Sequence, residues 1–153
     1  MTGLRPASAA RAPLQKLRSR LKITIRPVDL VAVKKVLVVD DSETIRLQVR
    51  KALTAEGYEV IEAVDGQDGL DQLRAVRDIR AVLCDVNMPR MTGIEFVAKA
   101  QGDGATPPIV MLTSEGQPSL IRRARDLGAK GWIVKPFKVE QLVAAMNRIT
   151  AGA

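Results

Sequence analysis

From Lys34 onward, short apolar runs alternate along the chain with stretches in which apolar residues recur at helical spacing. The apolar runs predict strands, because the buried strands of a parallel sheet carry nearly continuous apolar residues. We expect these strands at residues 36–39, 58–62, 80–85, 107–112 and 130–134. The stretches between them predict amphipathic helices. An α/β fold follows, with one parallel sheet and helices on both of its faces.

Residues that begin and end helices stand at the junctions of this pattern. Asp41 or Ser42 can cap the first helix, and Pro118 suits the first position of the fourth. Gly57 and Gly128 stand where the first and fourth helices should end, since glycine readily adopts the left-handed conformation that closes a helix. These signals predict five β/α units in succession.

Four of the five predicted strands end on polar residues, which are Asp40 with Asp41, Asp85, Thr113 and Lys135. Right-handed crossovers bring the carboxyl ends of parallel strands to one edge of the sheet, so these side chains should converge. Crowded carboxylates repel one another unless they share a cation, and Mg²⁺ binds through carboxylates together with phosphate oxygens. A carboxylate can also accept a phosphoryl group, whose oxygens a lysine and a hydroxyl can hold. The residues therefore predict a Mg²⁺-dependent aspartyl-phosphate site centred on Asp85.

Each of these residues also has a simpler explanation when it is taken alone. An Asp-Asp-Ser sequence is a common helix cap. Lys135 is explained equally well as a solvated charge, and Thr113 as a hydroxyl at the end of a strand. The combination at one edge of the sheet is what favours a functional site.

Composition excludes several classes of function. The chain of 153 residues contains no histidine, which excludes a Ser-His-Asp triad and a histidine-ligated zinc site. Its one cysteine, Cys84, forms no internal disulfide and suits core packing in a reducing compartment, so we expect a cytoplasmic protein. No apolar run reaches the length of a membrane span.

Residues 1–33 differ from the rest of the chain. They hold seven basic residues and one acidic residue, which accounts for +6 of the net charge of +7. Leu14, Leu17 and Leu21 have the spacing of a short basic amphipathic helix, so a membrane-surface anchor, a phosphate-binding arm and a targeting segment are functional alternatives. We favour a disordered extension, because apolar residues are sparse here. The charge lies outside the predicted domain of residues 34–153, so we expect no direct DNA binding.

The polar strand ends fall within longer motifs, which are Asp40-Asp41-Ser42, Asp85-Val86-Asn87-Met88-Pro89 with Gly93, Thr113-Ser114, and Lys135-Pro136-Phe137. With these motifs, residues 34–153 resemble the receiver domain of a two-component response regulator of the single-domain CheY type. The resemblance implies a flavodoxin-like, doubly wound sheet of five parallel strands in the order 2-1-3-4-5, with five helices. It also implies a cis peptide bond between Lys135 and Pro136.

The resemblance implies a role for each residue of the site. Asp85 accepts a phosphoryl group from a phosphohistidine of a sensor histidine kinase. Asp41 and Asp85 ligate Mg²⁺ through their side chains, Asn87 through its backbone carbonyl, and Asp40 mostly through water. The phosphoryl oxygens contact Thr113 and Lys135.

A conformational switch is also implied by the resemblance. When phosphorylation draws Thr113 inward, an aromatic side chain on the fifth strand turns from an exposed to a buried position. That residue is usually Tyr or Phe but here is Trp132, whose larger indole carries an N–H that needs a partner; filling the core is its alternative role. The face that changes comprises the fourth helix, fifth strand and fifth helix and binds a downstream protein. Three arginines favour an acidic partner there, or simply form a solvated face: Arg122, Arg123 and Arg125.

The implied function is that of a stand-alone response regulator, most consistent with chemotaxis or motility signalling. The alternative is a phosphorelay intermediate that passes the phosphoryl group to a histidine phosphotransfer protein. Such a protein is not an enzyme toward other substrates and catalyses only its own phosphorylation and dephosphorylation. Asn87 and Glu115 occupy positions that help to govern dephosphorylation in the family, and this pair predicts an acyl phosphate that lasts seconds to minutes.

Two enzymes of similar fold are disfavoured by the residues at the strand ends. A haloacid-dehalogenase-like phosphatase needs Asp-x-Asp after the first strand, where this chain has Asp-Asp-Ser. A flavodoxin needs a Ser/Thr/Gly-rich phosphate loop at the same place and aromatic residues to enclose the flavin.

Overall fold

The computed structural model describes residues 33–104, 106–114 and 118–151. Lys34–Ala153 forms one compact unit. The predictions made for residues 1–32 and for Glu115 lie outside the described residues, and the boundary after residue 33 stays a prediction.

Five parallel strands form a single sheet. They are β1 (Lys35–Val39), β2 (Glu59–Ala63), β3 (Ile79–Asp85), β4 (Ile109–Thr113) and β5 (Gly131–Val134). Their order is β2-β1-β3-β4-β5, and every neighbouring pair is parallel. This order confirms the flavodoxin-like arrangement. Because Val39 pairs with Cys84 and Asp85 with Leu112, the carboxyl ends of the central strands lie level with one another.

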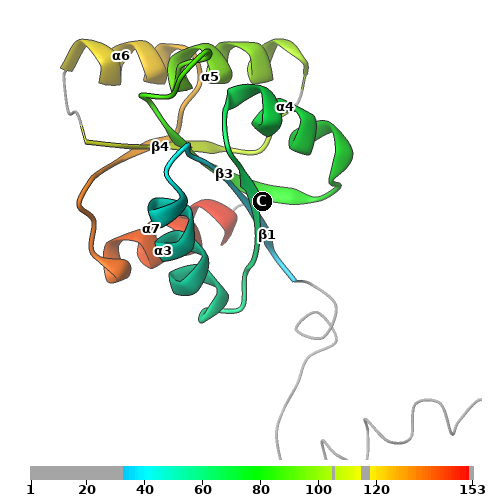
Figure 1. Ribbon diagram of the computed structural model, residues 1–153, viewed down its shortest axis with the longest axis vertical. Coiled ribbons are helices and arrows are strands. Elements are labelled where there is room, and N and C mark those ends of the chain that lie inside the picture. Colours follow the sequence, from blue (N-terminus) through cyan, green and yellow to red (C-terminus); the bar gives the residue numbers. More distant parts are fainter. Residues whose placement is uncertain (1–32, 105, 115–117, 152–153) are drawn as a thin grey trace, which may run out of the picture. The chain divides into compact units, whose positions relative to one another are not determined.

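Five helices in the described residues cover the two faces of the sheet (Figure 1). They are α3 (Glu43–Thr54), α4 (Gly66–Ala75), α5 (Gly93–Gly102), α6 (Pro118–Asp126) and α7 (Val139–Ala151). Helices α4, α5 and α6 contribute Leu70, Phe96 and Ala124 to the core on one face of the sheet. Helices α3 and α7 contribute Leu53 and Leu142 to the core on the other face. The sheet is therefore buried on both sides, as its apolar strands predict.

The predicted helix ends are largely confirmed. The side chain of Ser42 accepts a hydrogen bond from the Ile45 N–H and caps α3, whereas Thr92 and Glu95 form a capping box at α5. Gly57 has a φ of 90° and Gly128 a φ of 110°, the left-handed conformation that glycine adopts without a Cβ penalty. Each closes its helix with a pair of backbone hydrogen bonds.

Strand boundaries differ from the predicted ones in one informative place. The fourth strand was expected from residue 107, but β4 begins at Ile109. Pro107 and Pro108 precede it, and a proline has no N–H to donate to a neighbouring strand. The Lys135–Pro136 peptide bond is cis, as expected. Within the described ranges, no helix combines the length and apolar character needed to cross a bilayer.

Candidate functional site

Polar residues from four neighbouring strands meet at the carboxyl edge of the sheet. These residues are Asp40 and Asp41 after β1, Asp85 at the end of β3, Thr113 at the end of β4, and Lys135 after β5. One carboxylate oxygen from each of the three aspartates lies within 4.8 Å of the other two. The edge of the sheet therefore carries a compact group of acids with a lysine beside it.

Asp40 is fixed in place by contacts on both sides of its carboxylate. Its side chain is 1% exposed, and Oδ2 accepts a hydrogen bond from Lys135 Nζ at 2.9 Å. The other oxygen, Oδ1, accepts from the Ser42 N–H at 2.8 Å. The backbone N–H of Asp40 donates to the carbonyl of Ala63 at 3.1 Å. Both oxygens of Asp40 are thus engaged within the protein, whereas Asp41 is exposed at the same rim.

Lys135 links the two buried acids. Its Nζ lies 3.4 Å from Asp85 Oδ1 in addition to the contact with Asp40, and its side chain is 16% exposed. Its backbone N–H donates to the carbonyl of Thr113 at 2.7 Å, which joins the ends of β4 and β5. A single ammonium group therefore faces two carboxylates in a partly buried setting, where charges interact more strongly than in water.

The electrostatic environment disfavours the ionised form of Asp85. Burial raises the pKa of Asp85 above 3.8, the negative charge of Asp40 adds to the effect, and Lys135 acts in the opposite direction. Burial also raises the pKa of the Cys84 thiol well above 9.0, and the negative charges of Asp85 and Asp40 add to this effect. The protonated thiol donates a hydrogen bond to the backbone carbonyl of Asp85 at 3.3 Å. Cys84 therefore belongs to the core, as the sequence analysis favoured.

The donor set fits a hard divalent cation. Three carboxylates face one lysine, and the pKa of Asp85 is raised first by burial and then by the charge of Asp40, with Lys135 acting in the opposite direction. A divalent ion would supply the missing positive charge, and carboxylate oxygens are the ligands that Mg²⁺ prefers. Asp41 and Asp85 are suited to direct ligation. Asp40 is less suited to it, because its two carboxylate oxygens already accept hydrogen bonds from Ser42 and Lys135.

The remaining predicted site residues surround this group. The side chain of Thr113 is fully buried, and Asn87 is exposed two residues beyond Asp85. Glu115 lies outside the described residues. The roles assigned to these residues stay predictions.

Trp132 occupies a half-buried position on β5. Its side chain packs against the core between the sheet and helices α4, α5 and α6. Its Nε1 is buried and has no hydrogen-bond partner within the described part of the chain. A pocket of about 360 Å³ opens beside it and is lined in part by Ile121, Arg125 and Lys130. The indole thus has free space next to it, and its N–H meets no acceptor among the residues that the structure describes.

Arg46 is a residue of the site that the sequence analysis did not identify. Its side chain is 12% exposed and pairs with Glu62 of β2, and its Nη1 donates to the backbone carbonyl of Asp40 at 2.6 Å. A signal was available, because Arg46 and Arg50 stand one turn apart on α3 and Glu62 is an acidic residue near the end of an edge strand. Only the pairing of β1 with β2 brings the three together.

Comparisons with known proteins agree with this geometry. Residues 36–147 match the model of the response regulator receiver domain. Chemotaxis protein CheY1 of Helicobacter pylori is 39% identical over 111 residues, which cover 71% of this chain and 90% of that protein. Transcriptional regulatory protein PdtaR of Mycobacterium tuberculosis is 38% identical over 119 residues, which cover 78% of this chain. That match spans only 58% of PdtaR.

Solved structures have the same architecture. Chemotaxis response regulator CheY4 of Vibrio cholerae superposes with a TM-score of 0.70 at 42% sequence identity, over 76% of this chain and 98% of that one. A CheY-like receiver domain protein from Methanospirillum hungatei superposes with a TM-score of 0.74 at 26% identity, over 78% and 95% of the two chains.

Proposed function

This chain belongs to the response regulator receiver family, and we propose on that premise that Asp85 accepts a phosphoryl group from a sensor histidine kinase. The family is one of signalling proteins, and two-component signalling is the setting in which the chain acts. Asp85 is the acceptor because it is the central carboxylate of the rim and pairs with Lys135.

The observation that supports this function best is the grouping of Asp40, Asp41 and Asp85 with Lys135 at one edge of the sheet. Asp41 and Asp85 would hold Mg²⁺ with the backbone carbonyl of Asn87, and Asp40 would act mostly through water. When bound, Mg²⁺ would neutralise charge on the carboxylate and on the incoming phosphoryl group. Lys135 supplies a positive charge, and Thr113 a hydroxyl, for the phosphoryl oxygens.

We propose that the phosphorylated form is reported through Thr113 and Trp132. Thr113 ends β4 next to β5, and Met111 of β4 pairs with Trp132 in the sheet. An inward movement of the Thr113 side chain would free space for the indole, whose Nε1 could then find a partner. The face formed by α6, β5 and α7 would change with it, and its exposed arginines favour an acidic downstream protein.

Chemotaxis or motility signalling is the output that we propose. Its support is the similarity to chemotaxis proteins such as CheY1 of Helicobacter pylori, which the chain matches over 90% of that protein's length. The second candidate, a phosphorelay intermediate, rests on the same phosphorylation site and differs only in the next acceptor. Binding tests with and without beryllofluoride, an acyl-phosphate mimic, against a flagellar-switch protein and a histidine phosphotransfer protein would separate the two.

Phosphorylation itself is tested by incubating the protein with acetyl phosphate and Mg²⁺, and separately with phosphorylated sensor kinases. We expect the wild type to gain one phosphoryl group, which hydroxylamine removes because the product is an acyl phosphate. Asp85→Asn should gain none, whereas Asp103→Asn should behave as the wild type, since Asp103 pairs with Arg74 on the surface. Equal labelling of Asp85→Asn and the wild type would refute the assignment of Asp85.

A further inference from the structure

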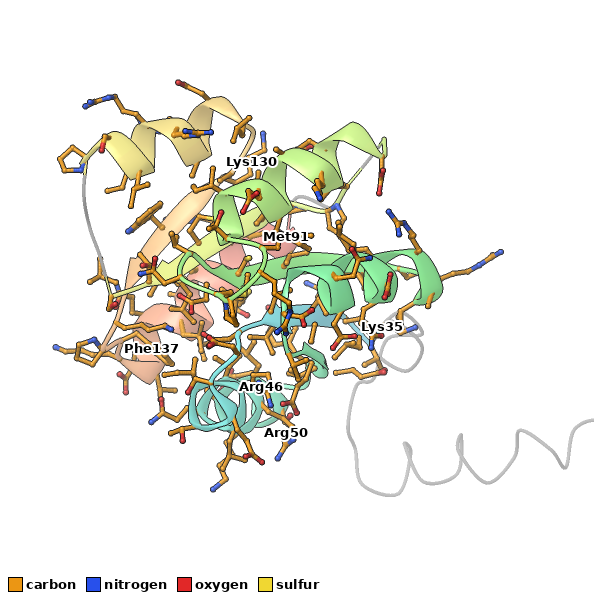
Figure 2. The ribbon with its side chains drawn as sticks, turned by 45° about the horizontal axis from the view of Figure 1, so that its top comes forward. Lys35, Arg46, Arg50, Met91, Lys130 and Phe137 are labelled. Carbon is orange, nitrogen blue, oxygen red and sulfur yellow. The ribbon has the colours of Figure 1, made fainter. Side chains whose placement is uncertain are left out.

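Arg46 connects the first acidic residue of the site to the neighbouring strand. From α3 its Nη1 donates to the backbone carbonyl of Asp40 at 2.6 Å, and its Nε donates to Glu62 Oε1 on β2 at 3.1 Å. The other oxygen of Glu62 accepts from Arg50, one turn further along the helix, at 2.5 Å. Figure 2 shows Arg46 and Arg50 together on α3. The planar guanidinium of arginine has the fork geometry needed to hold two acceptors at once.

These contacts complete the attachment of Asp40 at four points. Its backbone N–H is bonded to Ala63 and its backbone carbonyl to Arg46, while the carboxylate is held by Ser42 and Lys135. The carbonyl belongs to the peptide that joins Asp40 to Asp41. Fixing the orientation of that peptide therefore fixes the direction in which Asp41 leaves the end of β1.

Asp41 needs such a constraint more than its neighbours do. It is exposed, yet its carboxylate must stay within 4.8 Å of the oxygens of Asp40 and Asp85 to share an ion with them. A bond from a charged donor in a partly buried setting is stronger than one between neutral groups. The contact between Arg46 and the Asp40 carbonyl is of this kind, and Glu62 keeps the guanidinium in place.

We propose that Arg46 is a positioning residue for the metal site, which it serves by holding the Asp40–Asp41 peptide so that the Asp41 carboxylate faces Asp85. The proposal rests on the proposed function, since it presupposes that these acids bind Mg²⁺. It adds a residue that touches neither the metal nor the phosphoryl group.

The direction of the change in Mg²⁺ affinity distinguishes a positioning role of Arg46 from a simple effect of its charge. Removing a positive charge near a cation site should tighten Mg²⁺ binding by relieving repulsion. Losing the orientation of Asp41 should weaken it, and loss of a residue that orients a ligand typically costs about tenfold or more in metal affinity. The two explanations therefore predict opposite signs for Arg46→Gln.

Arg50 provides the matched control. It also pairs with Glu62, but its side chain is 48% exposed and it donates to the Glu62 carboxylate rather than to the Asp40 carbonyl. The variants Arg46→Gln, Arg46→Lys and Arg50→Gln would be titrated with MgCl₂ and followed by the backbone amide signals of Asp41 and Ser42 in NMR spectra. Arg46→Lys keeps the charge but cannot hold both acceptors, so it separates geometry from charge and serves if Arg46→Gln does not fold.

We expect Mg²⁺ affinity to fall about tenfold in Arg46→Gln and by a smaller factor in Arg46→Lys, and to stay the same or rise slightly in Arg50→Gln. Unchanged or tighter binding by the folded Arg46 variants would overturn the proposal, even if they melt at lower temperature. An equal loss in Arg50→Gln would overturn it too, because the effect would then come through Glu62 alone. If the wild type binds no Mg²⁺, the proposed function itself fails.

Discussion

Gly93 lies against the backbone of Asp85 and Val86, and replacing it with alanine should reduce both the stability of the protein and its affinity for Mg²⁺. Gly93 begins α5, and its N–H donates to the carbonyl of Val86 at 2.8 Å. A Cβ at this position would press directly on the backbone oxygen of Asp85 and lie 2.8 Å from the Cα of Val86. The atoms that it meets are backbone, so no side chain can rotate to make room.

The size of the effect follows from these contacts. Carbon atoms prefer separations of about 3.5 Å or more, so the contact with the Val86 Cα alone requires a movement of roughly 0.7 Å. The Asp85 oxygen lies closer still and requires a larger one. Inserting a methyl group into a packed region costs about 1–3 kcal/mol, and we expect the upper part of this range because the opposing atoms are fixed in β3. The movement starts at Asp85, so Mg²⁺ affinity should fall together with stability.

Gly102 is the matched control at the other end of the same helix. A Cβ there meets nothing within 4 Å, so Gly102→Ala should stabilise the protein by about 0.4–1 kcal/mol through a less flexible unfolded chain. Urea unfolding without metal, followed by circular dichroism, would measure both variants against the wild type. The steric argument would be refuted if Gly93→Ala were as stable as the wild type. It would also be refuted if the free energy of unfolding changed in the same direction in both variants.

Two further predictions concern Asp85 and Trp132. Because the pKa of Asp85 is raised above 3.8 by burial, its ionised form should cost stability as the pH rises through that pKa, and the cost should vanish below 3.8. Asp85→Asn should therefore unfold at higher urea concentration than the wild type at pH 7 in metal-free buffer, and the difference should disappear as the pH approaches 3.8; a less stable variant at pH 7 would contradict this. Trp132 is the only tryptophan in the chain, so beryllofluoride with Mg²⁺ should shift its fluorescence to shorter wavelength as the indole moves inward. Asp85→Asn should show no shift, and unchanged emission from the wild type would argue against the switch.

The fold was predictable from the sequence because its strands carry a local signal. Runs such as residues 36–39 are continuous apolar segments that end abruptly on acids, and each strand end marks the rim of a parallel sheet. The order of the strands came from the resemblance rather than from the pattern, since periodicity does not specify which strands are neighbours. The start of β4 was misplaced because Pro107 and Pro108 adjoin the apolar run but have no N–H to donate to a neighbouring strand.

The contacts that orient the site were not predictable in the same way. Arg46 and Glu62 stand 16 positions apart, on a helix and an edge strand that each look like ordinary polar surface in the sequence. Their meeting depends on the register of β1 with β2, which pairs Val38 with Glu62. The half-buried position of Trp132 likewise depends on how α6 packs over β5. Sequence patterns thus identify the groups proposed for the chemistry more readily than the groups that position them.

Lys135 shows why the supporting contacts matter to the proposed chemistry. It lies 2.9 Å from Asp40 but 3.4 Å from Asp85, so the lysine is held more closely by the acid that is fully buried than by the proposed phosphoryl acceptor. A buried charge that loses its partner is strongly destabilising, so the contact with Asp40 favours keeping the ammonium group at the rim. The ionised form of Asp85 is already disfavoured, so an added cation would stabilise this carboxylate in particular. The asymmetry that positions the lysine therefore leaves the central acid less neutralised, which favours the proposed roles of Asp85 in binding Mg²⁺ and accepting a phosphoryl group.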